Sequence, residues 1–518
     1  MTVYLLGIDV GTTGSKALLV DASGFVKASV TTEYPMFTPQ PLWAEQSPAE
    51  WWAATATSIQ RVLNVGGVKA SQVAGVGLTG QMHGLVLLDT QGEVLRPCIM
   101  WNDQRTAAQC AAITRQVGPE NVLRLTGNPV LPGFTAPKIV WVREHEPEVY
   151  ARVAKVLLPK DYARYRLTGG FFSEVSDASG TSLFDVGRRQ WSADMLQALD
   201  VPRAWLPEVT ESPVVSARVS AAAAKETGLL EGTPVAGGGG DQAAQAVGTG
   251  IIREGVVSAT LGTSGVVFAA SDTYRVEPGG KLHAFCHAVP GMWHLMGVML
   301  SAAGSFRWYR DALGELERRR AEESGRDAYD LLTEAAAQVP PGCEGLLFLP
   351  YLTGERTPYP DPNARGVFFG LTLRHTKAHV TRAVLEGVSY GLRDSLELMR
   401  GLGLSIAQVR ASGGGARSGL WRQILADVFD TQIVTVNVTE GAAYGAALLA
   451  GAGVGVYPDV TAACDAAIRV TGRTEPGPAA AVYADYYPRY RALYPALAPQ
   501  FEAIARVVSK HLGTHQEP

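Results

Sequence analysis

The stretch GIDVGTTGSKALLVD, residues 7–21, decides the fold. Two apolar runs, each typical of a β-strand, flank a tip built from Gly11, Thr12, Thr13 and Gly14. A hairpin can be closed by two residues, so this tip is longer than a turn requires. Its backbone N–H groups and hydroxyls are donors suited to an anion such as phosphate. A tight turn that simply needs glycine is the alternative interpretation.

Asp9 lies on the strand that enters this tip, two residues before Gly11. A carboxylate repels an anion, so Asp9 is not expected to bind phosphate directly. Mg²⁺ prefers oxygen ligands and keeps several waters, so an ion between Asp9 and a phosphate would reconcile the two charges. The alternative is a strand-end aspartate that caps the turn through its own backbone.

The second half of the chain resembles the first. LGTSGVVFAASD at 261–272 lines up with VGTTGSKALLVD at 10–21, and an ancient duplication would explain the match. At 518 residues the chain is too long for one ordinary core. Strands alternate with helices in both halves, which predicts an α/β protein of two similar domains, residues 1–247 and 248–518.

Composition and charge exclude several classes of partner. The net charge is −4 without a long basic run, so neither nucleic acid nor a membrane surface is an expected partner. No apolar run reaches membrane-spanning length, and no leader peptide is evident at the start. The five cysteines form no C-x-x-C pair. These features predict a reduced, cytoplasmic protein.

Two further glycine-rich stretches each precede a helical pattern. In AGGGGDQAAQAVGTG, residues 236–250, the glycines leave the backbone open to close approach, and Asp241 follows them. Asp241 is either a helix N-cap or a general base. In ASGGGARSGLWRQILAD, residues 411–427, a nucleotide could lie against bare backbone.

Several other motifs carry weaker signals. GVGLTG at 75–80 matches G-x-G-x-x-G but lies along a strand, and the phosphate-loop lysine motif is absent. His83 in GQMHG is a lone histidine, which is more often structural than catalytic. His283, Cys286 and His287 lie close together in sequence without an evident fourth ligand, so they do not predict a metal site.

These pieces together resemble a known family. D-x-G-T-T near the start, G-G-G-D in the middle and G-G-G-A-x-S late in the chain are the layout of the FGGY carbohydrate kinases. Two longer stretches, GFTAPKIVWVREH at 133–145 and GVFFGLTLRHTKAHVTRAVLE at 366–386, are similar to the family's signatures, and the resemblance runs from about residue 4 to 450. It implies two similar actin/hexokinase-like ATPase domains with an interdomain active-site cleft.

The resemblance also implies roles for individual residues. Within the family, LTGQMHGLVLLD, IMWNDQRT and LPYLTGERTPYPDPNARGVFFGL are most similar to the members that phosphorylate xylulose. Asp241 is then the base and Asp9 faces the metal. The ketose is expected near Gln81, Met82, His83, Trp101, Asn102, Asp241 and Gln242. The phosphates and adenosine of ATP are expected near Thr12, Thr13, Gly262, Thr263, Ser264, Gly414, Gly415, Ala416 and Ser418. Many relatives have Asn where this chain has Gln242, which leaves the exact ketose open.

The expected reaction is ATP- and Mg²⁺-dependent phosphorylation of the C5 hydroxyl of D-xylulose. Another ketose or polyol, such as D-ribulose or L-xylulose, is the alternative acceptor. A sugar sensor without activity, or an actin- or Hsp70-like ATPase, is the more distant alternative. Because water is also an acceptor, we expect the two halves to close over the sugar, which scattering would detect as compaction. No motif specifies an oligomeric state, and a homodimer stays an open alternative.

Overall fold

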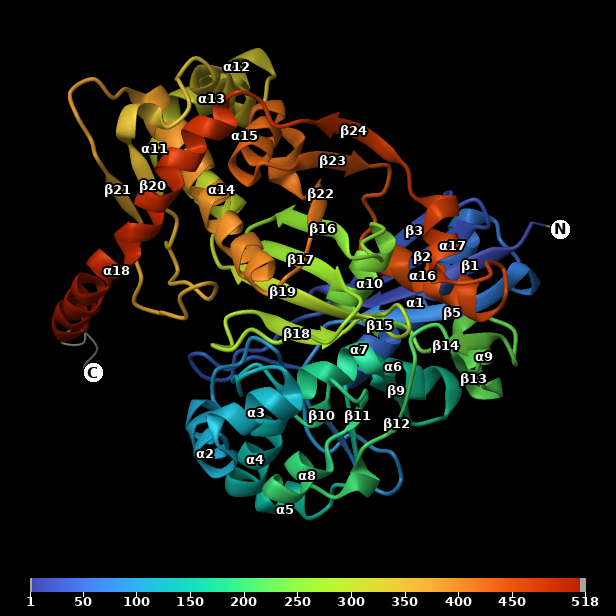
Figure 1. Cartoon of the computed structure of the whole chain (residues 1–518). Helices are drawn as coiled ribbons and strands as arrows, with labels where there is room; N and C mark the ends of the chain where they lie inside the picture. The colour runs from blue at the N-terminus through green and yellow to red at the C-terminus, as the bar shows by residue number, and fades with distance from the viewer. Residues whose placement is uncertain (1, 513–518) are drawn as a thin grey trace. The chain divides into compact units, whose positions relative to one another are not determined.

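A computed structural model describes residues 2–512, which form two compact units (Figure 1). Unit 1 contains residues up to 253 together with 270–294 and 437–469, and unit 2 contains 254–269, 295–436 and the remaining C-terminal residues. Each unit therefore combines stretches that are distant in sequence. The predicted domain boundary between residues 247 and 248 stays a prediction.

Unit 1 is built on a mixed sheet that contains both parallel and antiparallel pairs. Its strand order is β13-β14-β5-β1-β2-β3, and β15 also pairs with β5. The two strands predicted around the first tip are confirmed as β1 and β2, and β3 extends them into a meander, because β1–β2 and β2–β3 are antiparallel pairs. β5 lies parallel to β1 on its other side. The strands are β1 (Tyr4–Val10), β2 (Gly14–Asp21), β3 (Val26–Glu33), β5 (Val73–Gly80), β13 (Val215–Arg218), β14 (Pro234–Ala236) and β15 (Gly239–Gly240).

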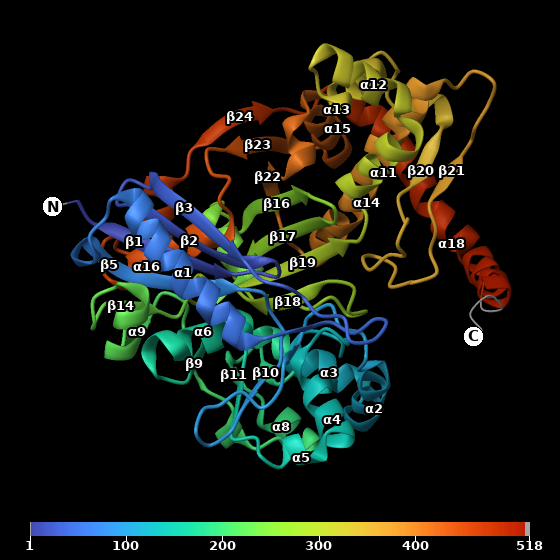
Figure 2. The ribbon, with the colours of Figure 1, turned by 180° about the vertical axis from the view of Figure 1, so that it is seen from behind.

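Helices cover both faces of this sheet (Figures 1 and 2). α1 (Pro48–Gly66) and α6 (Pro159–Thr168) pack on one face, and α10 (Asp241–Gly248) and α16 (Ala442–Gly453) pack on the other. Glycine on the strands lets α16 come close: a Cβ on Gly7 would lie 1.9 Å from the Ala443 carbonyl oxygen, and one on Gly77 would lie 1.9 Å from that of Ala446. Larger residues there would push the helix off the sheet.

A second hydrophobic core in unit 1 is helical. It includes Leu85, Ile113, Ile139, Trp141 and Leu196. The elements that contribute to it are β6 (Val86–Leu88), α2 (Ala107–Val117), α3 (Pro119–Thr126), α4 (Thr135–His145), α5 (Pro147–Tyr150), β8 (Lys155–Leu157) and α8 (Ala193–Leu199). Other elements of unit 1 are β9 (Phe172–Glu174), α7 (Val175–Ala178), β12 (Glu208–Thr210), α9 (Ala221–Thr227) and α17 (Val460–Ala467).

The second sheet has the order β18-β19-β17-β16-β22-β23-β24. Its strands are β16 (Gly255–Leu261), β17 (Gly265–Ser271), β18 (His283–Cys286), β19 (Trp293–Met299), β22 (Ile406–Ser412), β23 (Gln432–Val436) and β24 (Val470–Thr474). As in the first sheet, an antiparallel hairpin (β16–β17) is followed by a parallel neighbour (β22) and ends in an antiparallel pair (β23–β24). This shared order is what an internal duplication would produce.

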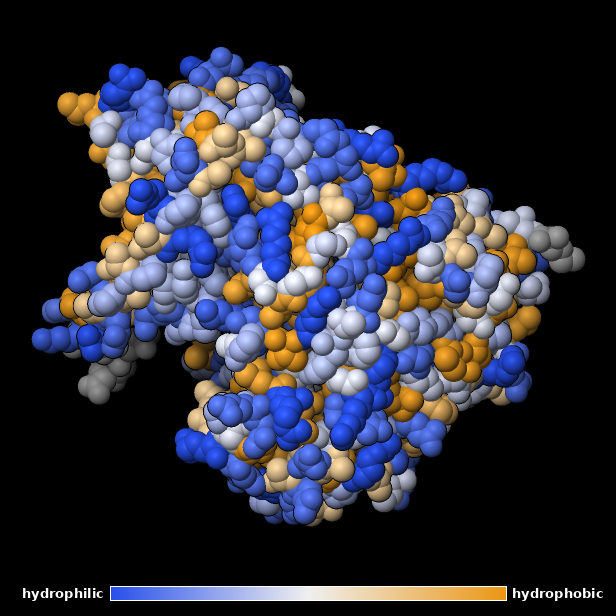
Figure 3. Space-filling view, in the orientation of Figure 1, coloured by the Kyte–Doolittle hydropathy of each residue, from blue (hydrophilic) through white to orange (hydrophobic). Residues whose placement is uncertain are grey.

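Helices of unit 2 surround α14, a 25-residue helix. α14 spans Lys377–Gly401, and Val384, Val388, Leu392 and Leu396 are buried, as their i, i+4 spacing predicts. The other elements are α11 (Ala303–Leu313), α12 (Glu315–Ser324), α13 (Ala328–Ala337), β20 (Leu347–Leu349), β21 (Val367–Phe369), α15 (Gly419–Phe429) and α18 (Ala479–Leu512). The space-filling view shows mostly hydrophilic residues over α12 (Figure 3). Within residues 2–512, no helix has the length and apolarity needed to cross a bilayer.

Candidate active site

Asp9 lies at the end of β1, next to the first hairpin tip. A Cβ on Gly11 would lie 4.0 Å from Asp9 Oδ1, so the carboxylate lies beside the tip backbone. That oxygen is buried and has no hydrogen-bond partner among the described residues. Burial raises the pKa of Asp9 to about 6, although Lys16 on the paired strand favours the charged form. The turn-capping alternative for Asp9 is thus not what the structure contains.

The two threonines of the first tip have different surroundings. Thr12 Oγ1 donates to Gln81 Oε1 at 3.3 Å and accepts from Trp101 Nε1 at 3.1 Å. Its carbonyl accepts from Gln46 Nε2 at 2.7 Å. Thr13 is exposed, and its hydroxyl has no hydrogen-bond partner in the part of the chain that the structure describes. Of the two predicted phosphate ligands, Thr13 therefore has the free hydroxyl, while Thr12 is tied to the residues predicted to bind the sugar.

Gln81, at the end of β5, joins these groups into one network. Its side chain is buried, and its Nε2 donates to Gln46 Oε1 at 3.0 Å. Trp51 Nε1 donates to the same oxygen at 3.0 Å. Trp101 is exposed apart from its bond to Thr12, and the neighbouring Asn102 has a buried Oδ1 without a partner. The predicted sugar residues Gln81, Trp101 and Asn102 are thereby brought near the first tip.

Asp241 is the first residue of α10 and follows the short strand β15. Gly239 and Gly240 pair with Thr79 and Gly80 of β5, while Asp9 pairs with Thr79 from the other side. The backbones carrying the two carboxylates are thus about two strand spacings apart, roughly 10 Å. Burial, followed by the charge of Asp9, raises the pKa of Asp241 to about 7.

The N-cap of α10 is Gly240, so Asp241 is not the helix N-cap. Its Oδ1 accepts a hydrogen bond from the adjacent N–H of Gln242 at 2.7 Å. The glycines before it mainly serve the protein's own packing. A Cβ on Gly238 would lie 1.8 Å from the Leu78 carbonyl oxygen, and one on Gly237 would lie 2.8 Å from that of Ser212. The expectation that all four glycines open the backbone to a ligand is therefore wrong for Gly237 and Gly238.

Met82 and His83 lie between β5 and this helix start. A Cβ on Gly240 would lie 2.9 Å from Met82 Sδ, so the methionine packs against the residue before Asp241. His83 has φ of 71°, unusual for a residue with a side chain. Its Nδ1 is 2.6 Å from the Gly180 carbonyl oxygen, and its ring stacks on Phe134.

Lys138, which composition and spacing gave no reason to single out, holds this conformation. Its Nζ donates to the carbonyls of His83 at 2.9 Å and Gly133 at 2.7 Å, and Thr135 Oγ1 also donates to the His83 carbonyl. Burial lowers the pKa of Lys138 to about 7. Spacing in the sequence does not reveal such a buried lysine, because its partners are backbone carbonyls and one of them, that of His83, is 55 residues away.

The two carboxylates suit two roles: one can bind a divalent cation, and the other can accept a proton. Burial raises the pKa of both half-buried carboxylates, and the charge of Asp9 raises that of Asp241 further, so a cation would be favoured at this site. Among residues 2–512, no group of three or more His, Cys, Asp or Glu side chains is arranged to hold a metal ion. Mg²⁺ commonly uses one or two carboxylates with waters and substrate phosphates, so Asp9 with its unpartnered oxygen fits that pattern.

The second tip, in unit 2, has exposed side chains, and its backbone carbonyls are hydrogen-bonded. The carbonyls of Gly262 and Thr263 accept hydrogen bonds of 2.9–3.1 Å from N–H groups at the start of α11. Thr263 and Ser264 are exposed. Their hydroxyls have no hydrogen-bond partner in the described part of unit 2, so they are free to bind an anion.

A cavity of about 450 Å³ in unit 2 contains part of the predicted adenosine site. Gly414, Gly415 and Ser418 line it, but Ala416 is buried and does not. The Ser418 hydroxyl also caps α15 by accepting from the Trp421 N–H. The lining residues that sequence analysis missed are Ala303, Phe306, Asp327, Tyr329, Asp330, Thr333, Arg417 and Trp421. Most of them lie some 80 residues or more before the glycine run, so no local pattern could connect them to it.

His283, Cys286 and His287, which lie close together in sequence, each have a structural partner. His283 Nδ1 is 3.1 Å from Asn128 Oδ1, Cys286 Sγ contacts the Val186 carbonyl, and His287 Nε2 is 2.9 Å from the Ile251 carbonyl oxygen. Burial lowers the pKa of His287 to about 4. All five cysteines are free and buried.

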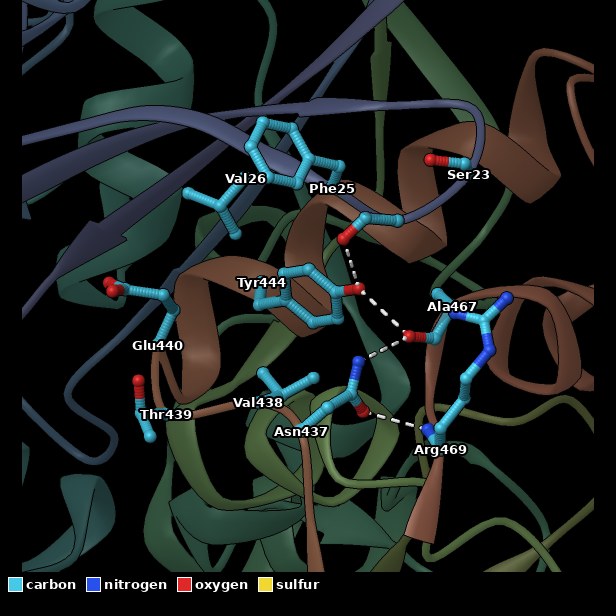
Figure 4. A pocket seen from close by; sticks show the side chains of 11 residues that line it. Ser23, Phe25, Val26, Asn437, Val438, Thr439, Glu440, Tyr444, Ala467 and Arg469 are labelled. Carbon is cyan, nitrogen blue, oxygen red and sulfur yellow. Dashed lines mark hydrogen bonds between the residues drawn. The ribbon is translucent and has the colours of Figure 1, made fainter. Parts of the chain in front are cut away.

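A second cavity, of about 440 Å³, lies at the opposite end of β2 from the first tip (Figure 4). Its polar groups largely bind one another. Tyr444 Oη donates to the Gly24 carbonyl at 2.7 Å, and Asn437 bonds to the Ala467 carbonyl and the Arg469 N–H. None of the predicted site residues lines it.

Two sheets of the same strand order, each carrying a hydroxyl-rich hairpin tip, define the actin- and hexokinase-like class of ATPase fold. Family comparisons narrow this class. The N-terminal domain model of the FGGY family of carbohydrate kinases matches residues 4–248, and its C-terminal domain model matches residues 257–454. The chain belongs to the FGGY family of carbohydrate kinases and is a phosphotransferase with an alcohol group as acceptor.

Individual relatives agree over most of their length. The xylulose kinase of Escherichia coli (strain K12) is 44% identical over 446 residues, 86% of this chain and 89% of that protein. The xylulose kinase of Bacillus subtilis (strain 168) is 38% identical over 466 residues, 90% and 91% of the two chains. The crystal structure of xylulose kinase from Rhodospirillum rubrum superposes with a TM-score of 0.89 at 33% identity, covering 96% of this chain and 100% of that one.

Proposed function

We propose that this carbohydrate kinase transfers the γ-phosphoryl group of ATP to the C5 hydroxyl of D-xylulose, giving D-xylulose 5-phosphate and ADP. The observation that carries the proposal is the pair of half-buried carboxylates, Asp9 and Asp241, beside Gln81, Met82 and His83. The relatives named xylulose kinase support the choice of sugar.

Asp241 acts as the general base in this proposal. A carboxylate with a pKa of about 7 is ionised in a useful fraction near neutral pH and still binds a proton readily. It takes the proton of the C5 hydroxyl as that oxygen bonds to the γ-phosphorus and the bond to the ADP oxygen breaks. Base catalysis supplies about 10²–10⁴-fold, and positioning and charge neutralisation supply the rest.

Other residues bind the two substrates. Gln81, Met82, His83, Trp101, Asn102 and Gln242 bind the ketose. Thr13, Thr263 and Ser264 donate to phosphate oxygens, with Thr12 holding the sugar-side network. Gly414, Gly415, Ser418 and the cavity residues Tyr329 and Arg417 border the adenosine, while Ala416 supports them from behind. Asp9 would hold Mg²⁺, which neutralises phosphate charge when bound.

The cysteines support the location that we propose for the protein. Five free, buried thiols suit a compartment where thiols stay reduced, and we place the protein in the cytoplasm.

The test is ADP release with D-xylulose, L-xylulose, D-ribulose, L-ribulose, glycerol and gluconate. We compare wild type with Asp241→Asn and with a matched control, Asp21→Asn, whose carboxylate caps the turn at the far end of β2. We expect selectivity for D-xylulose and a fall in kcat of about 10³-fold in Asp241→Asn alone. Selectivity for another sugar would contradict the substrate, and full activity of Asp241→Asn would contradict the base.

A further inference from the structure

One buried segment, Glu174–Ser182, reaches both sides of the sugar site in unit 1. Its sequence is EVSDASGTS, and its polar residues are almost completely buried. It contains α7 and a following 3₁₀ turn, and α7 lies against β15, the strand that leads into Asp241 (Figure 1). Burying so many polar groups is costly unless each has a specific partner.

Ser176 connects this segment to the base. Its Oγ accepts a hydrogen bond from the Gly240 N–H at 3.0 Å and donates to Glu174 Oε1 at 2.9 Å. Gly240 is the N-cap residue of α10, and Asp241 follows it directly. A shift of Gly240 would therefore move the carboxylate of Asp241 with it.

Glu174 anchors Ser176. Its two oxygens accept from the N–H groups of Ser176 and Asp177 at 2.7 and 2.8 Å and from the Ser212 hydroxyl at 2.8 Å. The buried Lys160 lies 3.8 Å from the same carboxylate and 3.5 Å from that of Asp177. The positive charge of Lys160 offsets the cost of keeping these carboxylates away from water.

The other end of the segment contacts the residues predicted to bind the sugar. The Gly180 carbonyl lies 2.6 Å from His83 Nδ1. A Cβ on Gly180 would lie 2.4 Å from the His83 ring and 3.1 Å from Met82 Cε. The segment thus supports His83 at one end and the residue before the base at the other.

We propose that Ser176 is a positioning residue for phosphoryl transfer: its hydroxyl fixes the Gly240 N–H and thereby orients the Asp241 carboxylate toward the acceptor hydroxyl. This inference rests on the proposed function, because it takes Asp241 as the base. A misplacement of about 1 Å at a reacting group costs as much as 10²-fold in rate. Ser176 touches neither substrate in this scheme, so its loss should lower kcat more than it raises KM.

Ser179 supplies a matched control. It lies three residues further along, is equally buried, donates to the Val175 carbonyl at 2.7 Å and accepts from the Cys286 N–H at 3.0 Å. It makes the same number of hydrogen bonds as Ser176 but none to Gly240. A general loss of packing or polar satisfaction should affect the two serines alike.

The experiment measures kcat and KM for D-xylulose with ATP and Mg²⁺, together with melting temperature, in Ser176→Ala, Ser176→Cys, Ser179→Ala, Asp241→Asn and the double variant Ser176→Ala/Asp241→Asn. We expect kcat to fall about tenfold in Ser176→Ala with KM within threefold. Ser176→Cys, which keeps a weak acceptor, should lie between Ser176→Ala and wild type. Ser179→Ala should keep its kcat. In the Asp241→Asn background the Ser176 change should have no further effect, because residues acting as one unit are not additive.

Three outcomes would overturn the inference. Equal losses in Ser176→Ala and Ser179→Ala would mean that the serine is structural only. A full tenfold loss on top of Asp241→Asn would mean that Ser176 acts by another route. Unchanged activity of Asp241→Asn would show that Asp241 is not the base, and the proposed function would fail with it. A failure of the Ser176 proposal alone would instead leave the loss of activity in Asp241→Asn intact.

Discussion

The two hairpin tips share a backbone plan but differ in chemistry at one decisive position. Aligning the tips places Asp9 of β1 where β16 has Thr260, and each pairs with a hydroxyl residue on the next parallel strand, Thr79 or Ser412. In the second sheet the two hydroxyls satisfy each other at 3.0 Å. In the first, an aspartate oxygen is left buried without a partner among the described residues.

This difference indicates that the two sheets have different tasks. Thr260 and Ser412 form a neutral, self-satisfied pair that stabilises the second sheet and adds no charge. At the equivalent position of the first sheet, burial of the Asp9 carboxylate costs electrostatic free energy. Such a cost is typical of a functional site. The second tip therefore suits direct phosphate binding, and the first combines the exposed Thr13 hydroxyl with a carboxylate that suits a cation.

The largest effect should come from making the first tip like the second. In Asp9→Thr we expect kcat to fall about 10³-fold, because the cation loses its carboxylate ligand. The measurement is ADP release as a function of Mg²⁺ concentration. Thr260→Ser, which keeps the hydroxyl that bonds to Ser412, is the matched control and should retain activity. Normal Mg²⁺ dependence in Asp9→Thr would show that Asp9 holds no metal.

The pH dependence should also belong to the first sheet alone. Burial raises the pKa of Asp9 to about 6 and that of Asp241 to about 7, and both must be ionised for the proposed roles. Activity should therefore rise from pH 5 to pH 8 and fall about tenfold between pH 7 and pH 6. Steady-state rates with saturating D-xylulose and ATP would measure this profile.

Nucleotide binding supplies the control for that profile. The second tip and its adjoining hydroxyl pair contain no group that titrates in this range. Adenosine affinity measured by calorimetry should stay level from pH 6 to pH 8, because adenosine lacks the terminal phosphate of ADP, which itself titrates in this range. A rate that does not change with pH would contradict the assignment of both carboxylates.

The smallest effects should distinguish the hydroxyls within and between the tips. Thr13→Ala and Thr263→Ala each remove a free, exposed hydroxyl, so KM for ATP should rise about fivefold while KM for the sugar stays constant. Thr12→Ala removes the bonds to Gln81 and Trp101 and should instead raise KM for the sugar. Initial rates with each substrate varied in turn would separate the two effects. If KM for ATP rose in Thr12→Ala but not in Thr13→Ala or Thr263→Ala, the assigned phosphate and sugar roles of these hydroxyls would be reversed.

By itself the sequence determined the strand–tip–strand pattern, the helices after each glycine run and the similarity between the two tips. Alternation and glycine placement are local properties, so the β1–β2–β3 meander, α10, α14 and α15 could all be predicted from short stretches. The same local patterns picked out Asp9, Asp241 and the GQMHG turn.

Only the tertiary structure decided how those groups are held. The charge effect of Asp9 on Asp241, the Lys138 bond to the His83 carbonyl and the Ser176 bond to Gly240 join residues 55–232 positions apart. Likewise, Gly237 and Gly238 proved to serve close backbone packing. Such contacts depend on which strand ends meet at one edge of a sheet, and a linear pattern does not encode that meeting point.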